Sequence, residues 1–119
     1  MAPPHAGMGI DNPGHIDVVA FDQAADLYRL VVVEDGPWDG SVVRLKRLQA
    51  KLNAYLGFAL DGRMSELYPG AEGKDVVIRL ELAQAPDPRT ASTLRRLGAG
   101  VREQGLAFEV VVAGAPFAA

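Results

Sequence analysis

The chain has 119 residues, of which 49% are hydrophobic and 23% charged, and its formal net charge is −3. This length predicts one domain with its own core, because domains of ~100–200 residues bury enough surface to fold without disulfides or metals. The sequence contains no cysteine, which excludes disulfide frameworks, thiolate zinc sites and cysteine nucleophiles. The acidic balance is unlike that of nucleic-acid-binding domains, which usually carry a basic excess.

Nothing in the sequence is suited to a membrane. The apolar runs are shorter than the ~20 residues that a membrane span needs. The segment from Met1 to Gly9 has neither the basic start nor the apolar stretch of a signal peptide. With the lack of cysteine, these features lead us to expect a cytoplasmic protein.

The charges are unevenly distributed along the chain. Residues 1–40 hold seven acidic residues against one basic residue, whereas residues 41–119 hold eight acidic and eleven basic residues. The first third of the chain is therefore strongly acidic, and the remainder is moderately basic.

The first part of the chain predicts a tail and a hairpin. Residues 1–15 are rich in proline and glycine and are expected to form a flexible N-terminal tail. Ile16 to Phe21 and Leu27 to Glu34 are apolar, β-branched runs joined by a short polar connector, a pattern typical of an antiparallel hairpin. We expect one folded domain over residues 16–114 and a short C-terminal tail over residues 115–119.

The strongest helix signal covers Val42 to Leu60. Apolar residues recur there at steps of three and four and so share one face: Leu45, Leu48, Leu52, Tyr55, Leu56 and Ala59. The basic residues fall mostly on the other face: Arg44, Lys46, Arg47 and Lys51. Asp39 or Ser41 can cap the start of this helix, and Gly62 can end it in the left-handed conformation.

The second half alternates strands and helices. Arg63 to Leu67 is a further helical turn, and Asp75 to Leu82 is the third strand. A second long helix begins at Pro88 with Asp87 as its cap, contains Gly98 and Gly100, which weaken it, and ends at Gly105. Leu106 to Val112 is the fourth strand.

The order ββαβαβ predicts an α+β two-layer sandwich. Two right-handed strand–helix–strand crossovers would place both helices on the same face of a mixed four-stranded sheet. The other face would stay open, and in the third strand it would carry Val77, Arg79 and Glu81, opposite a fully apolar face. Arg79 and Glu109 can then pair across neighbouring strands.

The open sheet face is the predicted interaction surface, because apolar side chains outside the core mark subunit and partner sites. We assign to this surface Val31, Val33, Arg79, Glu109 and Val111, together with Trp38. Trp38 either seals the core where the second strand meets the long helix or forms an exposed anchor for a partner.

Several motifs together resemble those of one protein family. They are Asn12-Pro13, Ile16-Asp17, Val32-Val33-Glu34-Asp35, Pro37-Trp38-Asp39, Leu48-Gln49-x-Lys51-Leu52-Asn53-Ala54-Tyr55, Tyr68-Pro69 and Val76-Val77-Ile78-Arg79. The chain resembles a family of small bacterial proteins of unknown function over nearly all of its length after the tail. The resemblance implies a single bacterial domain and no particular activity.

Clustered acids suggest one alternative, a small metal-dependent phosphodiesterase. The acids expected near one end of the sheet are Asp17, Glu34, Asp35 and Asp39, with Asp75 or Glu81 beside them. Carboxylates of this kind hold Mg²⁺ and promote phosphodiester cleavage. A restriction-type nuclease also needs Glu-x-Lys, and the lysine is missing after both Glu34 and Glu81.

Basic helix faces suggest a second alternative, a weak nucleic-acid binder. The second helix adds four arginines to those of the first: Arg89, Arg95, Arg96 and Arg102. Stacking aromatics or a groove-entering helix are not evident, so a solvated charged face is the ordinary explanation.

No catalytic constellation emerges, and we assign no catalytic, cofactor-binding or metal-binding residue. The sequence favours a non-enzymatic interaction or accessory domain that forms a homodimer through the open sheet face.

Overall fold

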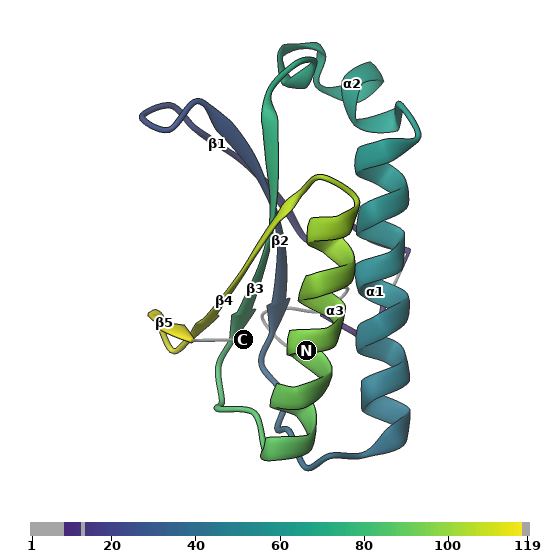
Figure 1. Cartoon of the computed structure of the whole chain (residues 1–119), viewed down its shortest axis with the longest axis vertical. Coiled ribbons are helices and arrows are strands. Elements are labelled where there is room, and N and C mark those ends of the chain that lie inside the picture. The colour runs from purple at the N-terminus through teal and green to yellow at the C-terminus, as the bar shows by residue number, and fades with distance from the viewer. Residues whose placement is uncertain (1–8, 13, 118–119) are drawn as a thin grey trace, which may run out of the picture.

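The computed structural model describes residues 9–12 and 14–117 and forms two layers, a twisted sheet and a layer of helices (Figure 1). The sheet contains five strands in the order β1-β2-β3-β4-β5. The central pairs β2–β3 and β3–β4 are parallel, and the outer pairs β1–β2 and β4–β5 are antiparallel. The strands are β1 (Val18–Asp22), β2 (Leu27–Glu34), β3 (Asp75–Leu82), β4 (Ala107–Val112) and β5 (Ala115–Phe117).

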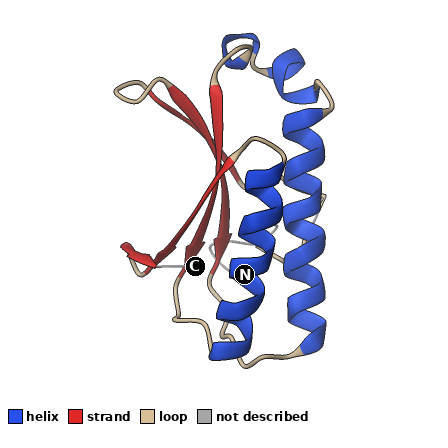
Figure 2. Ribbon diagram, viewed as in Figure 1, coloured by secondary structure: helices blue, strands red, loops and turns tan. Residues whose placement is uncertain are grey.

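The helices lie together on one face of this sheet, and the other face is open (Figure 2). They are α1 (Val42–Leu60), the short α2 (Arg63–Leu67), a 3-10 turn (Pro69–Ala71) and α3 (Pro88–Glu103). The predicted α+β sandwich with a mixed sheet is therefore confirmed. Within the described part of the chain, no helix is both long and apolar enough to cross a membrane.

The predicted count of four strands is wrong, because a fifth strand follows β4. Ala113 and Gly114 both have positive φ angles, 48° and 84°. Two consecutive residues of this kind form the tight turn that matches the twist of an antiparallel hairpin. The chain therefore reverses after Val112, and Ala115 pairs with it. Residues 115–117 had been expected in the C-terminal tail, and residues 118–119 lie outside the described part.

The N-terminal segment also differs from the expected tail. Ile10 is fully buried in the core, and the main-chain oxygens of Asn12 and His15 accept hydrogen bonds from Lys51 Nζ at 2.8 and 2.6 Å. The described residues before β1 therefore pack against α1. Residues 1–8 of the predicted tail lie outside the described part.

β1 begins at Val18 rather than at Ile16, and a tyrosine explains the difference. The Tyr55 hydroxyl accepts a hydrogen bond from the Asp17 N–H at 2.8 Å and donates one to the Val31 carbonyl at 2.7 Å. This side chain from α1 thus bridges the segment before β1 and strand β2 at the point where the two strands separate. Ladder pairing ends there, with Val18 opposite Val31.

The core lies between the sheet and the two long helices. The helix-facing side chains of β2, β3 and β4 meet the apolar stripes of α1 and α3, as the alternation in β3 predicts. Its fully buried members are Leu30, Val32, Ile78 and Leu80 from the sheet and Leu48, Leu52, Tyr55, Leu94 and Val101 from the helices. The helices cover only this face of the strands, so the opposite face remains open.

Candidate functional site

The open face consists of the side chains of β2, β3 and β4 that point away from the helices. Its members are Arg29, Val31 and Val33 of β2, Val77, Arg79 and Glu81 of β3, and Glu109 and Val111 of β4. The strand register aligns Val31, Arg79 and Glu109 in one row across the sheet, and Val33, Glu81 and Val111 in the next. Five of the six residues predicted for the interaction surface thus lie side by side.

Ion pairs connect the strands across this face. Glu109 Oε1 lies 2.8 Å from Arg29 Nε and 3.2 Å from Arg79 Nη1, so the predicted pair between Arg79 and Glu109 is present. Arg79 Nε also lies 3.0 Å from Glu81 Oε1, and Arg29 pairs with Asp22 of β1 at 2.6 Å. The carboxylates of Asp22 and Glu109 raise the pKa of the Arg29 guanidinium above its ordinary value.

The network covers most of the valines beneath it. Arg29 reaches from β2 over β3 to an acid on β4, and Val77 lies in the intervening strand. Val31, Val77 and Val111 are buried although they face away from the helices, whereas Val33 is half-buried. The open face is therefore a lattice of paired charges over valines, with Val33 as its partly accessible apolar position.

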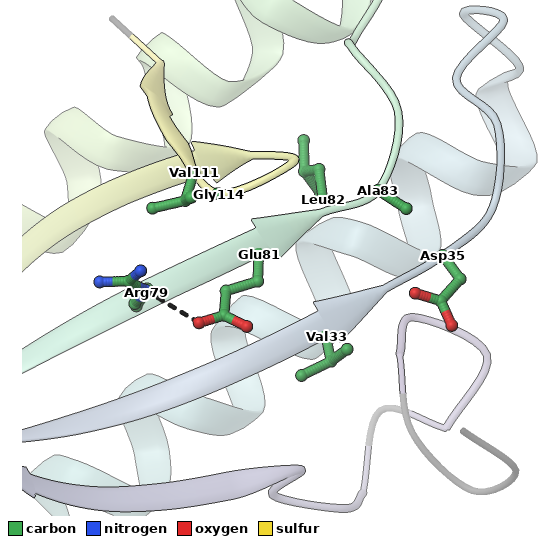
Figure 3. Close-up of a pocket in the computed structure, with 8 residues that line it drawn as sticks. All are labelled: Val33, Asp35, Arg79, Glu81, Leu82, Ala83, Val111 and Gly114. Atoms are coloured by element: carbon green, nitrogen blue, oxygen red, sulfur yellow. Dashed lines mark hydrogen bonds and ion pairs between the residues drawn. The ribbon is translucent and has the colours of Figure 1, made fainter. Parts of the chain in front are cut away.

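A hollow of about 230 Å³ lies at the carboxyl ends of the parallel strands (Figure 3). This sheet hollow is lined by Val33, Asp35, Arg79, Glu81, Leu82, Ala83, Val111 and Gly114. Its volume is below the ~300 Å³ at which pockets for drug-sized ligands begin. No serine, threonine or histidine is among these lining residues, and the charged ones are Asp35, Arg79 and Glu81.

Trp38 is separated from the other predicted interaction residues. Its side chain is 7% exposed and belongs to the core on the helix side of the sheet. The Arg44 guanidinium stacks over its ring at 4.8 Å from the centroid. The indole Nε1–H has no hydrogen-bond partner among the described residues. Of its two expected positions, Trp38 thus occupies the one in the core.

Most of the acids considered for a metal site bind a cation or a main-chain group, namely Asp17, Glu34, Asp39 and Glu81. Asp17 Oδ1 lies 2.7 Å from Lys51 Nζ, and Glu34 Oε2 lies 2.8 Å from Arg44. Asp75 pairs with Leu27 and so stands at the opposite end of the sheet from Glu34. Among the described residues, no group of three histidines or acids is arranged to hold a metal ion.

Lys51 corrects the predicted helix faces. It was expected on the solvent side of α1, but its side chain is fully buried. Its ammonium group donates hydrogen bonds to the Asp17 carboxylate and to two main-chain oxygens. These contacts replace the water that the charged group loses on burial. A signal was present in the spacing, because Lys51 lies three residues after Leu48 and four before Tyr55, within the apolar stripe.

Glu34 is held ionised by its surroundings. Burial opposes the charge, but the Ile10 N–H, the Arg44 guanidinium and the Gly36 N–H together lower the pKa of this carboxyl below its usual value. The contacts to Ile10 and Gly36 measure 3.0 and 2.8 Å. Glu34 therefore fastens both the N-terminal segment and the loop after β2.

These features define a class of protein, a small α+β sandwich with an ion-paired open sheet face. The chain belongs to a family of unknown function, DUF6572, whose members it matches over residues 8–114. This match confirms the expected resemblance to a family of small proteins of unknown function. Neither a curated protein nor a solved structure matches the chain.

Proposed function

We propose that this protein is an interaction domain that self-associates through the open face of β2, β3 and β4. The observation that supports the proposal is the lattice of paired charges over buried valines on a sheet face that no described helix covers. On such a face the aliphatic side chains are already shielded from water, and ion pairs hold the charged side chains in place. A partner therefore meets an ordered surface and loses less conformational entropy on binding.

The charges favour a second copy of the chain as the partner. Two-fold dimers bring the same patch of both subunits together, so the patch must complement itself. The open face carries two arginines, on β2 and β3, and two glutamates, on β3 and β4, and ion pairs connect them. In a two-fold pair, each arginine can face a glutamate of the other subunit, while the half-buried Val33 lies at the contact between the two faces.

Light scattering over a wide concentration range tests this proposal. We expect the wild-type protein to show the mass of a dimer and Val33→Glu to show that of a monomer, because the substitution buries an unpaired carboxylate at the interface. Val33 is the best position for this change, since Val31 and Val111 are buried within one chain and their substitution would endanger the fold.

Val43→Glu is the matched control, because Val43 is an exposed valine on α1, on the other layer. It should leave the dimer intact. A wild-type monomer at every concentration would overturn the proposal, as would equal dissociation by both substitutions.

A further inference from the structure

A second hollow lies on the opposite layer, between α1 and α3. The two helices run side by side (Figure 1), and residues of both helices line a space of about 200 Å³. This helix hollow is lined by Val42, Leu45, Lys46 and Gln49 of α1 and Arg89, Thr93 and Arg96 of α3. Its lining therefore contains three cations and no acid.

The other cations of α1 have a structural partner, which distinguishes Lys46 from them. The pairs are Arg44 with Glu34, Arg47 with Asp11, and Lys51 with Asp17. Lys46, Arg89 and Arg96 form no ion pair with any acid in the described part of the chain. All three cations that line the helix hollow are thus without an ion-pair partner among the described residues.

The helices themselves supply no counter-charge at this place. α1 contains no acidic residue, and the single acid of α3 is Glu103 at its far end. A solvated helix face commonly alternates acids and bases at spacings of three and four residues, which pair with each other. Here the acids are missing, although the whole chain has a net charge of −3.

The axis of α1 adds a smaller contribution of the same sign, whereas the N-terminus of α3 already faces the Asp87 carboxylate. Both helices begin at the same end of the molecule (Figure 1), and the lining residues fall mainly in their first two turns. The partial positive charge of a helix N-terminus favours anions there. The side chain of Ser41 makes no capping hydrogen bond to α1, whereas Asp87 caps α3 through the N–H groups of Arg89 and Thr90.

We propose that the helix hollow binds a phosphate-bearing small anion through Lys46, Arg89 and Arg96. Arginine guanidinium groups bind phosphate oxygens in pairs, and lysine adds a point charge. The volume of about 200 Å³ is suited to one or two phosphate groups and is too small to enclose a nucleotide. The site is independent of the open sheet face, since it lies on the other layer.

Calorimetric titration with inorganic pyrophosphate at low salt tests the proposal. We expect saturable binding that weakens as salt is added, and about tenfold weaker binding after Lys46→Gln or Arg96→Gln, because each removes one charge-assisted contact. Both residues are exposed, so the variants should fold, and circular dichroism verifies this.

Arg95→Gln is the matched control, since Arg95 is an exposed arginine beside Arg96 that does not line the helix hollow. It should retain nearly the full affinity. A parallel titration with ATP identifies the source of the phosphate: equal affinity indicates recognition of the phosphates alone, and tighter binding of ATP indicates a nucleotide that extends over the adjacent surface. Absence of binding of both probes at millimolar concentration, or equal loss in all three variants, would overturn the proposal.

Discussion

Lys51 and Asp17 form the most buried ion pair of the described chain, with both side chains inaccessible to water. Asp17 also accepts hydrogen bonds from the N–H groups of Gly9 and Val33 at 3.0 and 2.9 Å. One carboxylate thus joins the N-terminal segment, β2 and α1. Burying charges has a high desolvation cost, so the pair serves mainly to define a single arrangement of these three segments.

We predict that Lys51→Met lowers the free energy of unfolding by about 3 kcal/mol, because it leaves the Asp17 carboxylate buried without its counter-charge. Urea titration followed by Trp38 fluorescence measures this change. Lys46→Met, at an exposed position of the same helix, should alter stability by less than about 0.5 kcal/mol. Similar effects of the two substitutions would contradict the importance of the buried pair.

Glu34 leads to a prediction about pH. Its pKa in the folded protein is lowered from 4.5, so the folded state holds this proton less tightly than the unfolded state. The stabilisation is therefore complete above the unfolded pKa and is lost as the pH falls through the folded pKa. Glu34→Gln should cost about 2 kcal/mol at pH 7, and the difference from wild type should shrink below pH 4. Urea titrations at both pH values measure it, and a constant difference would contradict the assignment.

At the scale of elements, α1 is the organising unit. Three of its cations bind acids that lie before it in the chain, and its Tyr55 hydroxyl bridges Asp17 and Val31. The uneven distribution of charge along the sequence thus has a structural explanation. Acids of the first third of the chain are attracted to the basic helix that follows them.

Two glycines of α3, Gly98 and Gly100, differ in how closely they approach β4. A methyl group on Gly98 would lie 2.7 Å from Phe108 Cδ2, whereas one on Gly100 would meet nothing within 4 Å. We predict that Gly98→Ala destabilises the protein by about 2 kcal/mol through overpacking. Gly100→Ala should stabilise it by up to about 1 kcal/mol, because alanine is the better helix former. Thermal unfolding of the two variants checks this, and stabilisation by both would show that α3 can move away from β4.

At the scale of the whole molecule, the two layers present different surfaces. The sheet offers a lattice of paired charges, and the helix hollow offers three cations and no acid among its lining residues. The proposed functions therefore use opposite sides of the protein and can operate at the same time.

Self-association through the sheet would make the melting temperature depend on protein concentration, since dimer formation stabilises the folded state by mass action. We predict that the melting temperature of the wild type rises with concentration and that this rise is absent in Val33→Glu. Differential scanning calorimetry of both proteins over a wide concentration range measures the effect. A concentration-independent wild-type transition would contradict a dimer that dissociates on unfolding.

The sequence by itself determined the elements that have strong local signals. Periodicity located Val42–Leu60, and apolar runs between turn residues located Leu27–Glu34 and Asp75–Leu82, with the bounds that the structure has. Alternation in β3 identified its open side. These features depend on interactions between near neighbours along the chain, so a linear pattern contains them. The pairing of Arg79 with Glu109 also followed, because neighbouring strands bring matching positions together.

Only the tertiary structure decided the rest. The burial of Lys51 requires an acid from thirty-four residues earlier in the chain and two main-chain oxygens, and no local pattern shows that these will converge. The β5 strand depends on an Ala113-Gly114 turn with weak sequence preference and on an available edge of β4. The packing of whole elements separates Trp38 from the open face. It also places Lys46 and Arg96 in the lining of one hollow. Such contacts come from distant parts of the chain, and three-dimensional packing brings them together.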